Sequence, residues 1–177
     1  NAKFINRNSI LISMTEVDIV VSELKITKEG VFDFDSLYKT FKDWLNLHQF
    51  DFFEKNYIDI TKVESKEIKI KFESEKKIDE YLKFGLEFTI KVSDFKIVLS
   101  ADKKKKLVKG ALNISISSAI QSDYAGEWEG KPFKKFMRGI YDKFIEGDKR
   151  ARLNSQIKEE TYSLYNEIKA FLNLQRF

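Results

Sequence analysis

Alternation of apolar and polar residues predicts β-strands through the middle of the chain. Every second residue is apolar across residues 68–72, 82–92 and 112–116, which is typical of a strand with one buried face. The charged run DKKKK at 102–106 reads as a hairpin loop, so we expect antiparallel neighbours. A further strand is expected over residues 16–27, where β-branched residues cluster before a turn at residues 28–30.

The alternation changes parity at Ser93–Asp94. Before this point the apolar positions are even-numbered, and after it Phe95, Ile97 and Leu99 form the apolar set. Because successive side chains of a strand point to opposite faces, one extra residue turns all the following side chains over. We therefore predict a bulge, bend or tight turn here, with Phe95, Ile97 and Leu99 facing inward beyond it.

Three other segments carry apolar residues at the spacing of a helix. The first follows Asp33, Asp35 or Ser36, each of which can cap a helix N-terminus. The second and third lie over residues 133–144 and about 148–174. The three apolar faces consist, in turn, of Leu37, Phe41, Trp44, Leu45 and His48; of Phe133, Phe136, Met137, Ile140, Tyr141 and Phe144; and of Ile157, Thr161, Leu164, Ile168 and Phe171.

Strands grouped between helices, without strand–helix–strand alternation, predict an α+β fold. We expect an antiparallel meander sheet of about four to five strands, with an N-terminal helix and two C-terminal helices packed on one face. The chain has 177 residues, of which 42% are hydrophobic, and is long enough to bury a core. Residues 15–177 are expected to form a single domain, and residues 1–14 an extension that is disordered or not native to the chain.

The segment WEGKPFKKFMRGIYDKF, residues 128–144, interleaves aromatic and basic residues and admits three interpretations. It is a nucleic-acid contact, a membrane-surface helix, or a helix docked on the sheet. Its aromatic residues share one stripe and its basic residues lie off that stripe, whereas stacking on bases needs exposed rings. Pro132 and Asp142 suit a docked helix, so we predict that the aromatic stripe is buried.

The residue inventory excludes several kinds of chemistry. With one histidine and no cysteine, the chain cannot hold a disulfide, a Cys/His metal cluster or a cysteine nucleophile. It also lacks a glycine-rich phosphate loop. Asp33 and Asp35 are interpreted as capping residues, Glu127 and Glu129 as loop residues, and His48 as a structural residue. We predict no catalytic residue, no metal site, no cofactor and no enzymatic activity.

The same inventory bears on location. The absence of cysteine, of a signal-peptide pattern near the N-terminus and of any long apolar stretch predicts a cytoplasmic protein with no membrane span.

Positive charge is concentrated in one part of the sequence. Residues 101–152 hold 13 Lys and Arg against 7 Asp and Glu, a net charge of +6. If the hairpin and the following helix share a face, they form a surface that attracts phosphates. The alternative is that these lysines keep the sheet rim soluble and discourage edge-to-edge association. The predicted phosphate-binding surface consists of Lys103, Lys104, Lys105, Lys106, Lys134, Lys135 and Arg138.

Three stretches together resemble a set of small archaeal proteins of unknown function. They are GVFDFDSLYKTFKDWL, KIKFESEKKIDEYLKF, and the ending WEGKPFKKFMRGIYDKF with EIKAFLNL. The resemblance covers most of residues 30–177, implies a cytoplasmic location, and carries no activity or cofactor.

Three functions remain open from the sequence. The first is a binding or assembly module that has a protein partner or associates with itself, because the aromatic residues and the last helix supply more apolar surface than one small sheet needs. The second is a nucleic-acid-associated protein that uses the basic hairpin and helix. The third is a carrier that holds an apolar ligand between the sheet and the long helix.

Overall fold

The computed structural model describes residues 16–61, 66–100, 104–125, 132–145 and 147–174. These ranges contain five strands and three helices. In chain order they are β1 (Glu16–Phe32), α1 (Phe34–Leu47), β2 (Asp51–Thr61), β3 (Lys66–Lys77), β4 (Leu82–Leu99), β5 (Lys106–Ser122), α2 (Pro132–Ile145) and α3 (Asp148–Leu174). This arrangement confirms the α+β fold predicted from the sequence.

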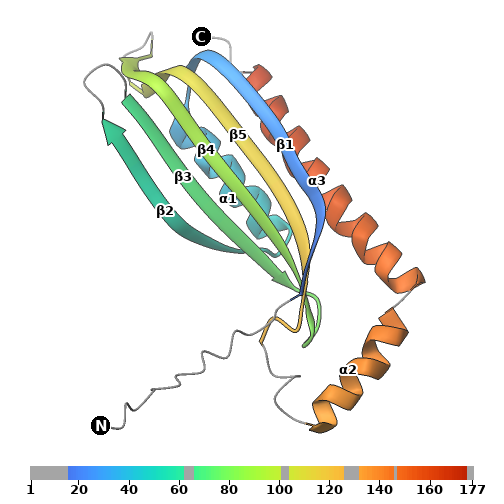
Figure 1. Cartoon of the computed structure of the whole chain (residues 1–177). Coiled ribbons are helices and arrows are strands. Elements are labelled where there is room, and N and C mark those ends of the chain that lie inside the picture. The colour runs from blue at the N-terminus through green and yellow to red at the C-terminus, as the bar shows by residue number, and fades with distance from the viewer. Residues whose placement is uncertain (1–15, 62–65, 101–103, 126–131, 146, 175–177) are drawn as a thin grey trace, which may run out of the picture.

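The five strands form one antiparallel sheet in the order β1-β5-β4-β3-β2. Strands β2 to β5 follow one another as a meander, and β1 closes the order by pairing with β5. Figure 1 shows α1 behind the sheet and α3 running along β1, so both helices cover the same side. Within the described ranges, no helix covers the other side of the sheet.

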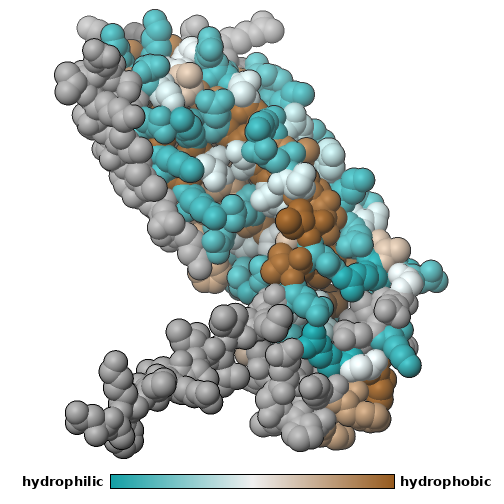
Figure 2. All heavy atoms as spheres, in the orientation of Figure 1, coloured by the Kyte–Doolittle hydropathy of each residue, from teal (hydrophilic) through white to brown (hydrophobic). Residues whose placement is uncertain are grey.

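The uncovered side of the sheet is predominantly polar. Figure 2 shows this side mostly in teal and white, with brown apolar atoms gathered toward the end of the molecule where α2 lies. The polarity follows from strand alternation, because the even-numbered apolar residues of β4 from Leu82 to Val92 all point to the helices.

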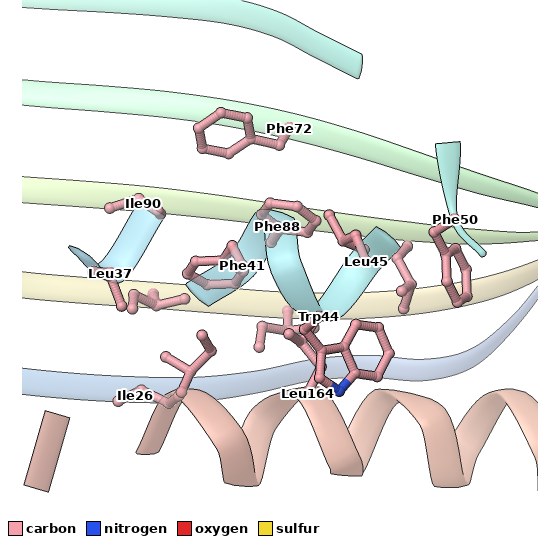
Figure 3. Packing of buried hydrophobic residues seen from close by; sticks show 14 of the residues in the cluster. Ile26, Leu37, Phe41, Trp44, Leu45, Phe50, Phe72, Phe88, Ile90 and Leu164 are labelled. Carbon is pink, nitrogen blue, oxygen red and sulfur yellow. The ribbon is translucent and has the colours of Figure 1, made fainter. Parts of the chain in front are cut away.

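Aromatic side chains from α1 and the sheet fill the space between them. Phe41 of α1 stacks on Phe88 of β4 with 5.0 Å between ring centroids, and Phe88 lies 5.2 Å from Phe72 of β3. Trp44 points toward α3, where Leu164 is fully buried (Figure 3). The core therefore has three components: α1 in the middle, the sheet on one side and α3 beside it.

The capping of α1 follows directly from its sequence. Asp33 accepts a hydrogen bond from the Ser36 backbone N–H at 2.9 Å and a second from the Ser36 hydroxyl at 2.7 Å. These bonds satisfy an N–H group that the first turn of a helix leaves unpaired. Of the three capping candidates, the N-cap is Asp33.

Two strand predictions need correction. The predicted turn at residues 28–30 is wrong, because β1 continues to Phe32 and Gly30 pairs with Gly110 of β5. Gly30 has φ of 116°, a conformation that glycine adopts without steric cost, so the strand passes through it. Strand β2 was not predicted, since a register shift between Glu54 and Asn56 interrupts its pairing with β3.

The parity change in β4 is confirmed, but its consequence is only partly so. The register shifts between Ser93 and Lys96, and Asp94 has φ of 51°. Phe95 packs against the core. Ile97 and Leu99 were predicted to face inward, and they are 67% and 59% exposed. The reason is that β3 pairs with β4 only as far as Ser93, so the last residues of β4 have a neighbouring strand on one side only.

The predicted burial of the α2 stripe is also wrong for three of its four side chains that the structure describes, while the fourth, Met137, is half-buried. Phe133, Phe136 and Ile140 are 72%, 65% and 48% exposed. Tyr141 and Phe144 belong to the same predicted stripe, and their side chains lie outside the described residues. Helix α2 packs on the beginning of α3 instead of the sheet (Figure 1).

Candidate binding surfaces

The basic hairpin lies at one end of the sheet, beside the start of α1. Ser100 and Lys105 close it, with the Ser100 N–H donating to the Lys105 carbonyl at 2.9 Å. The Lys105 ammonium lies 3.5 Å from the Asp33 carboxylate. Lys104 and Lys106 are exposed, and Lys103 lies outside the described residues.

The charge of Lys105 acts on the capping carboxylate. Burial alone raises the pKa of Asp33. The hydrogen bonds from Ser36 and the Lys105 charge outweigh this effect and hold the pKa below its ordinary value. One of the predicted phosphate-binding lysines is therefore engaged in stabilising the first helix.

Helix α2 lies at the opposite end of the sheet from this hairpin (Figure 1). Arg138 donates to the Glu16 carboxylate at 2.8 Å. Glu16 begins β1 and pairs with Ser122 of β5, and Ser122 also pairs with Leu82, the first residue of β4. The hairpin begins 17 residues further along β4, after Leu99. The structure therefore separates Arg138 from the hairpin lysines instead of gathering them on one face. The side chains of Lys134 and Lys135 lie outside the described residues.

Acidic residues at the start of β1 hold the helices at this end. Glu16 binds Arg138 of α2, and Asp18 forms an ion pair with Arg150 of α3. Val17 and Ile19 alternate with them and are 53% and 71% exposed. One side of the strand therefore anchors the helices by charge, and the other adds apolar surface at the same end of the molecule.

The open face of the sheet is crossed by ion pairs between β3 and β4. Hydrogen bonding to Glu87 raises the pKa of Lys71 despite its partial burial, and the charges of Glu87 and Glu73 act in the same direction. A hollow of about 390 Å³ lies beside these pairs, over Gly85. The cross-strand pairs are Lys71–Glu87 at 2.8 Å, Lys83–Glu75 at 2.7 Å and Lys91–Glu67 at 3.0 Å.

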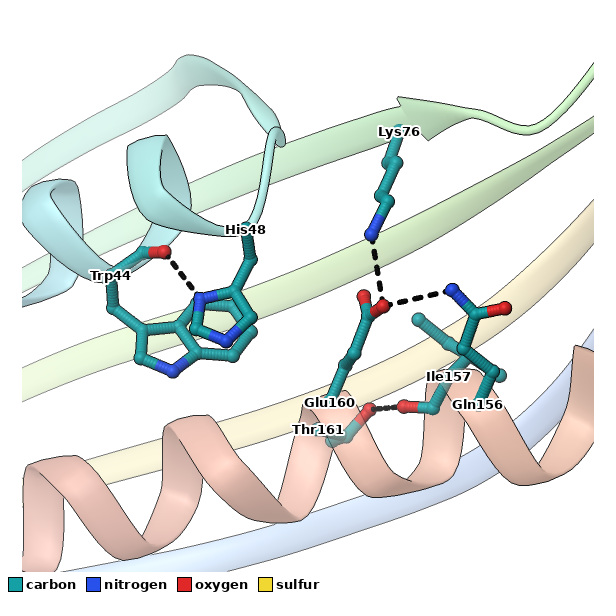
Figure 4. A network of polar contacts seen from close by, with 7 residues as sticks. All are labelled: Trp44, His48, Lys76, Gln156, Ile157, Glu160 and Thr161. Carbon is teal, nitrogen blue, oxygen red and sulfur yellow. Dashed lines mark hydrogen bonds and ion pairs between the residues drawn. The ribbon is translucent and has the colours of Figure 1, made fainter.

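A polar network lies on the inner side, where α3 crosses β3. Lys76 donates to Glu160 at 2.9 Å, and the Gln156 amide donates to the same carboxylate oxygen at 3.0 Å (Figure 4). The side chains of Lys76 and Glu160 are only 18% and 15% exposed. Thr161, on the next residue of the helix, donates to the Ile157 carbonyl. These bonds let the polar residues lie at the margin of an aromatic core.

His48 has a structural environment at the end of α1. Its ring stacks on Trp44 with 3.8 Å between centroids, and its Nδ1 lies 2.9 Å from the Trp44 carbonyl oxygen (Figure 4). One ring nitrogen of His48 is therefore hydrogen-bonded to the last turn of α1. The contacts agree with the structural role expected from the sequence.

At the far end of α3, Lys28 donates to the carbonyl of Leu172. Burial lowers the pKa of Lys28 from its ordinary value. A cation at this place complements the unpaired carbonyls of a helix C-terminus. A hollow of about 400 Å³ lies beside it, between β1 and α3.

The remaining candidates give no site in the described part of the chain. No three His, Cys, Asp or Glu side chains in those ranges lie together as a group that could hold a metal ion. Asp33 is the helix cap, Asp35 lies in the first turn of the same helix, and Glu127 and Glu129 lie outside the described residues. None of the helices in the described ranges is long and apolar enough to cross a membrane.

Comparison with known proteins adds no family assignment. No protein-family model matches the chain, and no curated protein sequence matches it either.

Proposed function

We propose that this protein is a non-enzymatic binding or assembly module and that the apolar side of α2 is its binding surface. The single observation that carries the proposal is the exposure of Phe133, Phe136 and Ile140 on one helix, at 72%, 65% and 48%. Single exposed apolar residues are common on protein surfaces, but a contiguous group on one element marks an interaction site.

The orientation of α2 supports this reading. At 3.6 residues per turn, Arg138 lies about 140–160° around the helix from each of Phe133, Phe136 and Ile140. Arg138 is the residue that binds Glu16 of β1, and its side chain is only 17% exposed. The helix is therefore held to the body by its polar side, which turns the apolar side outward.

Nucleic-acid association is the second candidate. The exposed Lys104 and Lys106 of the hairpin support it. The separation of hairpin and α2 counts against one continuous phosphate-binding surface. Any such binding would rest on a few lysines at one end of the molecule, and so would be weak and sensitive to salt.

Transport of an apolar ligand has less support. The space between the sheet and the helices is occupied by side chains, with Phe41 stacked on Phe88 and with Leu164 and Ile168 fully buried. A carrier would need this packing to open.

The test compares material retained by three versions of the protein during native purification. They are the wild type, F133S/F136S, and the control L47S/F53S, in which two other exposed apolar residues are changed. Retained protein, lipid and nucleic acid are measured by mass spectrometry and by absorbance at 260 and 280 nm. The proposal expects one class of molecule, or a second copy of the chain, to be retained by the wild type and the control and lost from F133S/F136S. Equal retention by all three would show that α2 is not the binding surface.

A further inference from the structure

We infer that the partner of α2 is the surface of an anionic lipid bilayer, on which the helix lies flat. This inference rests on the proposed function and specifies its partner. The exposed aromatic side chains, the tethered polar side and the exposed Lys143 at the border of the apolar side each point to this arrangement.

The apolar side of α2 has the form of a helix that lies in a membrane interface. Its 14 residues span about 21 Å at 1.5 Å per residue, too short to cross a bilayer. Phe133, Phe136 and Ile140 recur at three- and four-residue intervals on one side. Helices of this kind insert their apolar side into the boundary between headgroups and acyl chains while the polar side stays in water.

An exposed lysine borders the apolar side of the helix. At 100° per residue, Lys143 lies about 20° beyond Phe136, whereas the backbone positions of Lys134 and Lys135 each lie 100° from the nearest exposed ring. Lys143 is exposed. A long basic side chain at this position can reach lipid phosphates while the rings insert beside it. Asp142, which favours docking in the sequence pattern, occupies a backbone position about 180° from Phe133 and so would not meet the bilayer.

The wider charge distribution favours the same partner. Residues 132–152 hold seven Lys and Arg against three Asp and Glu, a net charge of +4 that equals the formal net charge of the whole chain. Three of these cations pair with acidic residues of the body: Arg138 with Glu16, Lys149 with Asp79 and Arg150 with Asp18. The positive charge that remains, to which the exposed Lys143 belongs, complements a negatively charged membrane and adds to the attraction from apolar insertion.

The exposed area is small for a stable protein interface. Phe133 and Phe136 together expose roughly 270 Å², taking about 200 Å² for a whole Phe residue, and Ile140, which is 48% exposed, adds less than either ring. A stable dimer buries about 800 Å² on each partner. A bilayer needs no matched surface, because each inserted ring contributes separately. Nucleic acid fits less well, because Arg138, on the polar side of the helix, binds Glu16 of the body instead of facing outward.

The first experiment measures partition of the full chain onto vesicles. We expect binding to phosphatidylcholine–phosphatidylglycerol vesicles, weak binding to phosphatidylcholine alone, and a decrease as ionic strength rises. F133S/F136S should weaken partition at least about a hundredfold, since most of the inserted area is removed. L47S/F53S, which changes apolar residues elsewhere, should bind like the wild type.

A matched set of lysine variants tests the electrostatic part. K143Q, beside the apolar side, should weaken partition about fivefold, which corresponds to about 1 kcal/mol for one lysine near an anionic surface. K134Q and K135Q change positions that both lie 100° from the nearest exposed ring, so each should have less than about a twofold effect. Equal effects of all three would contradict the flat orientation.

A fluorescent label reports insertion directly. Because the chain has no cysteine, I140C provides a unique attachment point for an environment-sensitive fluorophore, and L47C provides the control. Anionic vesicles should shift the emission of the label at residue 140 to shorter wavelength and leave the label at residue 47 unchanged.

The outcomes separate this inference from the proposed function. If vesicles do not bind but light scattering shows self-association that F133S/F136S abolishes, α2 is a binding surface for a second copy and the lipid inference is wrong. If the chain binds neutral and anionic vesicles equally, the role of the lysines is wrong. If F133S/F136S matches the wild type in vesicle binding, self-association and retained material, both proposals fail.

Discussion

Helices α2 and α3 follow one another in the chain and are both amphipathic, yet they use their apolar sides in opposite ways. In α3, Leu164 and Ile168 are fully buried against the sheet and α1. In α2, Phe133 and Phe136 remain mostly exposed. The separation of apolar from polar residues around the helix is sharper in α2 than in α3. A strongly amphipathic sequence pattern therefore does not show whether the apolar side of a helix is buried in the protein.

Length and anchoring explain the difference. Helix α3 has 27 residues and runs along β1 and β5, so its buried positions recur over about five turns, from Leu153 to Leu172. Helix α2 has 14 residues and is joined to the body by its polar side through Arg138. A long helix that lies on a sheet must bury its apolar side to be stable, whereas a short helix that lies off the sheet leaves that side available.

The largest expected effect contrasts core residues of α3 with exposed residues of α2. L164A and I168A should each lower the free energy of unfolding by about 2–5 kcal/mol, because each leaves a cavity in a packed core. F133S and F136S should each change it by less than about 0.5 kcal/mol. Urea denaturation followed by circular dichroism measures both. A loss above about 2 kcal/mol for the α2 variants would show that their rings are buried in solution, and the contrast between the helices would disappear.

The next effect concerns the contact of α3 with β3. E160A should lower the free energy of unfolding by about 1–3 kcal/mol, because it leaves the Lys76 ammonium partly buried without its carboxylate. E159A, the adjacent and exposed acidic residue of the same helix, is the matched control and should stay within about 0.5 kcal/mol of the wild type. Equal behaviour of the two variants in urea denaturation would mean that the Lys76–Glu160 pair does not hold α3 to the sheet.

The cap of α1 gives a smaller effect that depends on pH. D33A should lower the free energy of unfolding by about 1 kcal/mol, and D33N by less, because an Asn side chain can also accept the Ser36 N–H. Since the pKa of Asp33 is lower in the folded state, its contribution is complete above the unfolded pKa of about 3.9 and is lost as the pH falls through the folded value. Acid titration of the three proteins should therefore show a smaller loss of stability for D33N than for the wild type. Identical acid profiles would contradict this linkage.

Periodicity in the sequence was enough to predict most of the fold. The alternation in β3, β4 and β5 and the parity change at Ser93–Asp94 are properties of the backbone, and the structure confirms them. The spacing in α3 predicted a helix over about 148–174, and the structure has Asp148–Leu174. These predictions succeed because buried faces impose a fixed period on the chain.

The surfaces could not be predicted in the same way. The sequence predicted the apolar stripe in residues 133–144. Whether another part of the protein covers this stripe depends on the position of α2 relative to the sheet and on the Arg138–Glu16 pair, and both are long-range features. The fate of Ile97 and Leu99 depended on where β3 ends rather than on their own alternation. The sequence pattern shows which side of a helix or strand is apolar, and the tertiary structure decides what packs against that side.

The smallest expected effect separates the hairpin from α2 as the basic binding surface. K103Q/K104Q/K106Q leaves Lys105 with Asp33, so the free energy of unfolding should change by less than about 0.5 kcal/mol. If α2 is the functional surface, binding to anionic vesicles should be unchanged, and affinity for mixed RNA and DNA should be weak in both proteins. A hairpin that neutralised six or more phosphates together with other cations would lose roughly a thousandfold in affinity between about 50 and 200 mM salt. Submicromolar nucleic-acid binding with that salt dependence, lost in the Gln variant, would contradict the assignment of the binding surface to α2. It would show instead that the hairpin, at the opposite end of the sheet, is the binding surface.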